Sequence, residues 1–262
     1  MKTLTLGSIC LVLSGLAAAH SPSPVSVEIV SPDGRGFREI PLESRDGAWR
    51  SYLQAERGAR YEVRVRNSSG ARLGLVIAVD GRNIINGKRS ELGRDEPMYV
   101  VAAGDTQDFA GWRASLDEIN EFYFTDWKDS YSEAFGDRSA RGVIAVAVYR
   151  EVPQPPPRVM QPYEERAAAD KSRAAGAASS PAPAARDESV GTGYGERRTD
   201  RAYEVEFVAE NAAESRHFIK YEWRETLCRK RVIDCGEPNR LWDDDRNETL
   251  GFAPPPPGGG RD

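Results

Sequence analysis

The sequence predicts a mainly β protein, an antiparallel β-sandwich or barrel-like fold with short helical insertions, joined to a disordered linker and tail. Residues 25–29 and 61–65 alternate apolar and polar side chains, which is the period of a strand with one face in solvent. Residues 74–79 and 142–148 are apolar throughout. Each of these runs is too short for an independent helix, so we expect two central strands covered on both faces. Asp-Gly pairs that suit tight turns stand near these stretches: Asp33–Gly34, Asp46–Gly47 and Asp80–Gly81.

Residues 1–19 have the order of a cleaved signal peptide, with Lys2 near the start, an apolar run at 11–16 and three alanines at 17–19. We therefore expect an exported protein, either periplasmic or secreted. The apolar run is shorter than the about 20 residues that a membrane-spanning helix needs. No later stretch comes close, so the sequence predicts no transmembrane segment.

Composition divides the rest of the chain. Residues 152–190 are rich in Pro, Ala and charge, with almost no large apolar side chains, and residues 236–262 form an acidic tail that contains a run of Pro and Gly. We expect both to be disordered. A β-sandwich domain at 20–151 and a second ordered segment at 191–235 remain. The net charge is −5, and Arg is interleaved with Asp and Glu, so no basic stripe indicates nucleic acid.

The segment 191–235 is expected to be a β-hairpin that docks on the first domain. Its stretches 203–207 and 218–223 are strand-like, and a lone two-stranded hairpin is marginally stable in water. The segment begins with the glycine-rich run Gly191–Gly195. A phosphate-binding loop needs a strand before it and a helix directly behind it. This run follows a linker and leads into a strand, so a flexible entry turn is expected.

Signal-peptide cleavage removes Cys10 and leaves Cys228 and Cys235 in a compartment where disulfides persist. We predict a bond between them. It would close a small ring around a basic triplet, so its stabilisation lies at the low end of the usual range. A zinc site needs about four ligands, and His217 is the one histidine nearby, which leaves the zinc alternative short of ligands.

Two short helical turns are expected where the capping-box pattern occurs, at Ser115–Glu118 and at Ser130–Glu133. The second should end at Gly136, in a left-handed C-cap. Capping and turn formation account for the acidic side chains of this region, whereas a calcium site would need about six to eight converging oxygens. These acidic residues are Asp126, Asp129, Glu133 and Asp137.

Aromatic residues suggest where a ligand contacts the protein. Large aromatic side chains are mostly buried, so Trp112 and Tyr123 are expected in the core. Exposed aromatic side chains on an exported β-sandwich can also form a flat platform for sugar rings, which keeps carbohydrate binding open as an alternative. Turn position and expected exposure select the candidate ligand contacts Arg113, Trp127, Tyr131 and the loop 80–89.

The chain has 2 histidines and lacks the Gly-x-Ser-x-Gly and His-Glu-x-x-His patterns. The sequence therefore predicts no catalytic residue, metal site or cofactor, and it names no carboxylate pair for glycoside hydrolysis. One oxidative alternative remains. Cleavage after Ala19 would make His20 the N-terminus, and its amine and ring could chelate copper together with His217. Strand alternation also places His217 on the face of Ile219, which favours a packed histidine instead.

Several motifs are spread over both ordered segments: VDGRNIING at 79–87, YVV at 99–101, GWR at 111–113, FYFT at 122–125, DSY at 129–131, GVIAVAV at 142–148 and GTGYG at 191–195. Together they resemble a family of exported proteobacterial proteins of uncharacterised function. The resemblance covers most of the mature chain outside the linker and tail, and it implies export but no activity and no catalytic residue. The cysteine pair and the tail depart from the family pattern. We therefore expect an exported, non-enzymatic binding or structural protein of the cell envelope, whose partner is an unknown protein or a carbohydrate.

Overall fold

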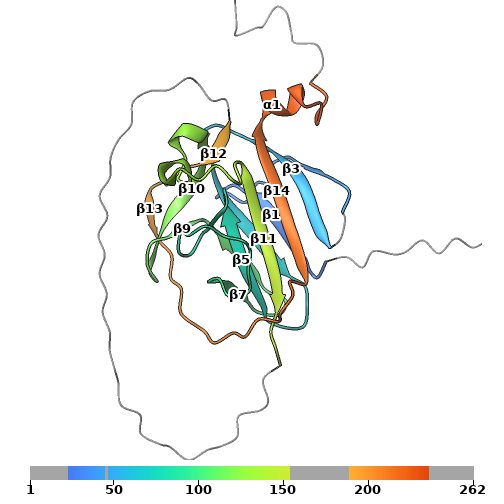
Figure 1. Ribbon diagram of the computed structural model, residues 1–262, viewed down its shortest axis with the longest axis vertical. Coiled ribbons are helices and arrows are strands. Elements are labelled where there is room, and N and C mark those ends of the chain that lie inside the picture. The colour runs from blue at the N-terminus through green and yellow to red at the C-terminus, as the bar shows by residue number, and fades with distance from the viewer. Residues whose placement is uncertain (1–22, 45–46, 154–188, 236–262) are drawn as a thin grey trace, which may run out of the picture.

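The computed structural model confirms the predicted mainly β fold (Figure 1). It describes residues 23–44, 47–153 and 189–235. Two seven-stranded sheets contribute to one hydrophobic core, in which side chains of both sheets are buried together. The predicted signal peptide and tail, and all of the predicted linker except its two ends, lie outside the described residues.

The first sheet is built around β4 (Arg60–Asn67) and β10 (Glu118–Asp126), which pair with each other. Strands β1 (Val25–Val30) and β8 (Thr106–Phe109) flank β4. The predicted alternating strands at 25–29 and 61–65 thus correspond to β1 and β4. Three short strands pair with β10: β9 (Gly111–Arg113), β12 (Val190–Thr192) and β13 (Arg197–Thr199).

The second sheet contains the two apolar runs as adjacent central strands, β5 and β11, as predicted. Every residue of β5 is buried, because the sheet is covered on both faces. The strand order is β2 (Glu39–Pro41), β3 (Ala48–Ala55), β14 (Ser215–Trp223), β11 (Val143–Arg150), β5 (Leu73–Val79) and β6 (Arg82–Asn83), with β7 (Tyr99–Val101) also on β5.

The segment 191–235 is not a hairpin but supplies strands to both sheets. Strands β12 and β13 extend the first sheet, whereas β14 lies between β3 and β11 in the second. The pairing of β14 with β3 is parallel, in contrast to the antiparallel sheets that the sequence predicts. A parallel pair needs a long crossover connection instead of a tight turn. Here β3 and β14 are separated by most of the described chain.

The predicted strand at 203–207 is wrong. Tyr203 is 84% exposed, and this stretch crosses the outer face of the second sheet without pairing as a strand. Phe207 packs there against a second buried cluster that includes Tyr149 and Ala209. Gly74 on β5 makes room for it, since a Cβ at Gly74 would lie 2.6 Å from the Phe207 ring.

The expected turn of helix at Ser115–Glu118 is also wrong, because β9 and β10 pair directly and residues 114–117 form the loop between them. The second expected turn is present as the 3₁₀ helix η2 (Glu133–Phe135), and a further 3₁₀ helix that was not predicted, η1 (Trp127–Asp129), precedes it. The Ser130 hydroxyl accepts the N–H of Glu133, and Gly136 ends η2 with a left-handed φ of 67°. None of the helices in the described ranges has the length and apolar character of a membrane span.

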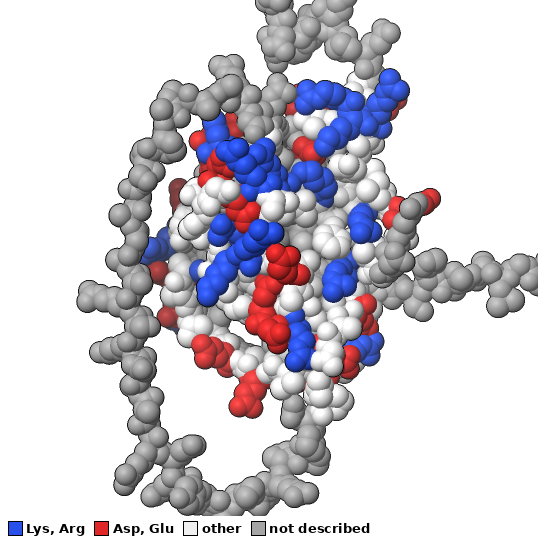
Figure 2. Space-filling model, viewed as in Figure 1, with Lys and Arg blue, Asp and Glu red and all other residues white. Residues whose placement is uncertain are grey.

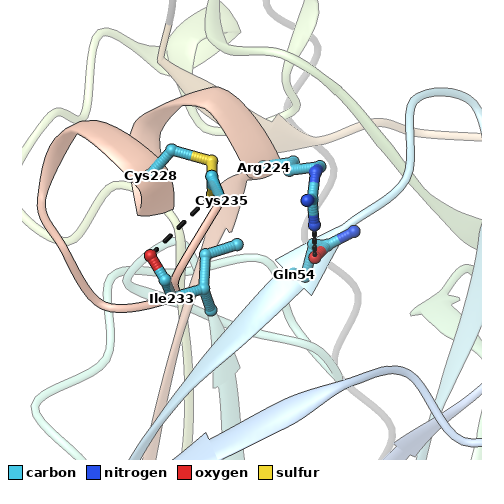
Figure 3. Close-up of a disulfide and its surroundings, with 5 residues drawn as sticks. All are labelled: Gln54, Arg224, Cys228, Ile233 and Cys235. Atoms are coloured by element: carbon cyan, nitrogen blue, oxygen red, sulfur yellow. Dashed lines mark hydrogen bonds between the residues drawn. A yellow bond between two sulfur atoms is a disulfide. The ribbon is translucent and has the colours of Figure 1, made fainter. Parts of the chain in front are cut away.

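Cys228 and Cys235 form the predicted disulfide, with Cα atoms 5.7 Å apart. The bond joins the end of helix α1 (Arg224–Arg229) to the last described residue and closes the turn that follows the helix (Figure 3). Arg224 at the start of α1 donates to the side chain of Gln54 on β3. The start of the helix is therefore tied to the second sheet, and its end is tied to the turn that follows.

Candidate functional site

A buried carboxylate lies between the two sheets. Asp80 and Gly81 follow β5 with φ values of 48° and 80°, the two positive values of a type I′ turn. One oxygen of the Asp80 carboxylate accepts the Gly142 N–H at 2.7 Å and the Tyr221 hydroxyl at 2.6 Å, and the other accepts the Thr192 N–H at 2.8 Å. The side chain has no access to solvent. Burial raises the pKa of this carboxyl to about 6.

The carboxylate ends a chain of hydroxyl groups. Because Tyr221 donates its proton to Asp80, it accepts the proton of the Thr192 hydroxyl at 2.7 Å. Thr192 in turn accepts the hydroxyl of Tyr61 at 2.7 Å. Burial raises the pKa of both tyrosines well above the usual value. The chain connects β4 and β12 with β14, and every member is sealed from solvent, so its role is to hold strands together.

The glycine-rich run docks against β10 as β12 and its continuation, where a flexible turn was expected. The Trp112 indole donates to the carbonyl of Gly193 at 3.0 Å, and the Gly193 N–H donates to the carbonyl of Tyr123 at 2.9 Å. A Cβ at Gly193 would lie 2.1 Å from the Tyr123 ring. Glycine is therefore required at this position by the close approach of the two strands.

This docking assembles an exposed aromatic cluster, Tyr131, Phe135 and Tyr194, which we call the aromatic ledge. Tyr131 and Tyr194 are stacked, with ring centroids 5.3 Å apart and an interplanar angle of 15°. Phe135 meets Tyr131 edge-on at 5.0 Å. Phe135 is 58% exposed and Tyr194 is 49% exposed. The buried Trp112 supports the ledge from behind, with its centroid 4.3 Å from that of Tyr131.

The loop 80–89 holds a cation beside the ledge. The Arg82 guanidinium lies 4.3 Å from the centroid of the Phe135 ring and donates to the carbonyl of Gly87 at 2.7 Å. The carboxylate of Asp137 lies 3.8 Å from the Arg82 guanidinium. Gly87 lies against the Tyr131 hydroxyl. The predicted contact loop therefore does lie at the ledge, where it fixes Arg82 and supports Tyr131.

The other two predicted contacts are placed elsewhere. Trp127 is only 1% exposed, and its indole donates to the Glu133 carboxylate at 2.6 Å, so the expectation of an exposed Trp127 is wrong. Its large ring is covered by the Arg141 guanidinium, 4.9 Å from the ring centroid, and by β12, where a Cβ at Gly191 would lie 3.1 Å from the ring. Arg113 binds Asp200, with a hydrogen bond of 2.6 Å to the Asp200 carbonyl and another to its carboxylate. Arg113 thus fastens the chain after β13 to β9.

His217 is a packed side chain on β14. It is 8% exposed, and the Trp49 ring lies nearly parallel to it at 6.3 Å. Burial lowers the pKa of His217 to about 4. His20, its partner in the copper hypothesis, lies outside the described residues. Among the residues that the structure describes, no group of three His, Cys, Asp or Glu side chains is arranged to hold a metal ion.

Sequence reasoning missed two members of the ledge, Phe135 and Tyr194. The sequence around each residue does contain a feature that indicates exposure. Tyr194 stands between two glycines, which offer no side chains to cover it, and Phe135 ends a single helical turn directly before Gly136. Their meeting was not predictable, because it depends on the long-range docking of β12.

Comparisons of the chain with models of protein families, with curated proteins and with solved structures gave no match. The interpretation of the ledge therefore rests on its own geometry.

Proposed function

We propose that the protein is exported and acts as a non-enzymatic binding protein of the cell envelope or extracellular space, with the aromatic ledge as its contact surface and carbohydrate as its ligand class. The observation that carries the proposal is the exposure of Phe135 and Tyr194 on a ledge that rigid neighbours support. Large apolar side chains that stay exposed beside one another mark interaction sites.

Carbohydrate fits the chemistry of the ledge. The face of an aromatic ring carries partial negative charge, which attracts the C–H groups on the apolar face of a sugar ring. The hydroxyls of Tyr131 and Tyr194 can donate and accept hydrogen bonds, and the Arg82 guanidinium beside Phe135 is a further donor. Stacked and edge-on contacts already fix the rings, so little side-chain entropy remains to be lost on binding.

The surroundings of the titratable groups support a role without catalysis. The Asp80 carboxylate accepts three hydrogen bonds and is fully buried. Glu133, at the start of η2, is paired with Arg138 and with the Trp127 indole. A general acid or base has to reach its substrate within hydrogen-bond distance, and these groups are committed to the fold.

A glycan array tests the proposal. We expect the wild-type protein to bind a subset of glycans, and we expect Tyr194→Ala and Phe135→Ala to abolish that signal. Tyr203→Ala is the matched control, because Tyr203 is an exposed aromatic residue that does not belong to the ledge. An array with no wild-type signal would exclude carbohydrate as the ligand. A protein partner would then remain, since Tyr and Arg side chains are also frequent hot spots of protein–protein interfaces. Unchanged binding by both ledge variants would exclude the ledge itself.

A further inference from the structure

A cavity opens where β14 runs into α1, beside the residues that lead into β12. This open cavity has a volume of about 320 Å³, which is at the lower end of the range for small-molecule sites. Cationic side chains dominate its lining: Arg141, Lys220, Arg229 and Lys230, against the single carboxylate of Glu222. Figure 2 shows Lys and Arg side chains gathered toward the end of the molecule where α1 lies.

The Glu222 carboxylate organises the two lysines of the cavity. It is buried, its oxygen is 3.5 Å from the Lys220 ammonium, and it forms a closer ion pair with Lys230. The Lys220 ammonium also donates to the carbonyl of Arg141 at 2.5 Å. Burial lowers the pKa of Lys220, and the Glu222 carboxylate opposes this shift. One carboxylate therefore faces two ammonium groups, and the lining as a whole has four cationic side chains and one carboxylate.

The two arginines are held by neighbouring groups. The Arg141 guanidinium lies 4.9 Å from the centroid of the buried Trp127 ring. Arg229 donates to the Thr226 hydroxyl at 3.2 Å, and the disulfide of Cys228 fixes the end of α1 directly beside it. A guanidinium offers a planar fork of donors that matches a phosphate group. The Trp127 ring restricts the Arg141 guanidinium before any ligand arrives, so less side-chain entropy is lost on binding.

We propose that this cavity binds a phosphate-bearing anion through Arg141, Arg229 and the two lysines. The whole chain carries a net charge of −5, so a concave site lined by four cationic side chains differs from the rest of the molecule. Such a site focuses the electrostatic field and raises the local concentration of anions. A free phosphorylated molecule and the headgroup of a phospholipid share this chemistry. The site is separate from the aromatic ledge and does not depend on the ledge's ligand.

Calorimetric titration of the full mature protein with inorganic pyrophosphate tests the proposal. We expect saturable binding at low ionic strength that weakens as NaCl is added, because salt screens the charges. Arg229→Gln and Arg141→Gln should each weaken the affinity at least about fivefold. Arg35→Gln is the matched control, since Arg35 pairs with Glu56 and does not line the cavity, and it should bind like the wild type.

A second kind of variant should strengthen pyrophosphate binding instead of weakening it. Glu222→Gln removes the carboxylate that competes for the two lysines, so pyrophosphate should bind about severalfold more tightly. Thermal unfolding of each variant identifies any that fails to fold, and the arginine variants then decide the question. The proposal is overturned if the wild type binds no pyrophosphate, or if Arg35→Gln weakens binding as much as Arg229→Gln.

Vesicle sedimentation distinguishes the two sources of phosphate. Wild-type protein that binds phosphatidylglycerol vesicles but not phosphatidylcholine vesicles, and loses this binding with Arg229→Gln, identifies a lipid headgroup as the ligand. Pyrophosphate binding without vesicle binding identifies a free phosphorylated molecule. Vesicle binding that persists unchanged in both arginine variants, without pyrophosphate binding, contradicts the proposed cavity.

Discussion

The hydroxyl of Tyr221 on β14 donates a hydrogen bond of 2.6 Å to the carboxylate of Asp80 at the end of β5. Neither side chain reaches solvent, and the N–H groups of Gly142 and Thr192 complete the surroundings of the carboxylate. Strand β5 precedes the predicted linker, whereas β14 follows it. The carboxylate is therefore a specific polar contact between the two ordered parts of the chain.

Stability should depend on pH through Asp80. Burial raises its pKa from 3.8 to about 6, so the folded state binds this proton more tightly than the unfolded state. The stabilisation from the protonated group is complete below about pH 4 and is lost as pH rises through about 6. At about 1.4 kcal/mol per pKa unit, the loss is roughly 3 kcal/mol.

Urea unfolding of wild type and Asp80→Asn between about pH 4 and pH 7 measures this effect. The wild-type free energy of unfolding, minus that of the variant, should fall by roughly 3 kcal/mol as pH rises. The asparagine does not titrate, so contributions from the other groups cancel. A difference that stays constant with pH would show that Asp80 titrates near its ordinary pKa.

The order of the hydroxyl chain predicts unequal effects for two tyrosines. Tyr221→Phe removes one of the three hydrogen bonds to the buried Asp80 carboxylate and the acceptor of the Thr192 hydroxyl proton, so we expect a loss of about 2–3 kcal/mol in the free energy of unfolding. Tyr61→Phe removes only the terminal donor and should cost about 1 kcal/mol. Tyr203→Phe, at an exposed position, serves as the control. Equal losses for Tyr221 and Tyr61 would contradict the proposed direction of the chain.

Close docking of β12 predicts that Gly193 tolerates no side chain. A methyl group there would meet the Tyr123 ring, so Gly193→Ala should destabilise the protein by about 1–3 kcal/mol. The Trp112 indole hydrogen bond to Gly193 should be lost as well, which changes tryptophan fluorescence. Gly70→Ala is the matched control, because nothing lies within 4 Å of the added methyl. Thermal unfolding of the two variants compares them, and similar melting temperatures would argue against the tight contact.

His217 should remain neutral in mildly acidic solution. Burial lowers its pKa from 6.5 to about 4, so the folded state binds the proton less tightly than the unfolded state. The contribution of neutral His217 to stability is present above about pH 6.5 and is lost as pH falls through about 4. The chain has 2 histidines, so NMR can follow each ring signal. The His217 signal should stay at its neutral position down to about pH 5, and titration near 6.5 would show an exposed ring.

Local patterns predicted the parts of the fold that local physics determines. The apolar runs became β5 and β11 because their composition requires cover on both faces. Asp80–Gly81 became a type I′ turn and Gly136 a left-handed cap because few residues adopt positive φ without strain. The disulfide followed from the cysteine count and short separation.

Long-range pairing explains what the sequence did not predict. The stretch 203–207 alternates like a strand, but β11 already pairs with β5 on one edge and with β14 on the other, so this stretch crosses the outer face of the second sheet instead. Trp127 was expected at the surface because it follows a strand, yet η1 folds it inward. The ledge forms only after β12 has docked, and no local pattern encodes the contact of Tyr194 with Tyr131.

The position of β14 between β3 and β11 determines how the protein responds to proteolysis. A protease that cleaves anywhere within 154–188 breaks one peptide bond but none of the strand pairings that join the two pieces. The fragments should therefore stay associated as a nicked two-chain complex. Separately expressed fragments should reconstitute when mixed, whereas a chain that stops at residue 153 lacks an interior strand of one sheet and should not fold.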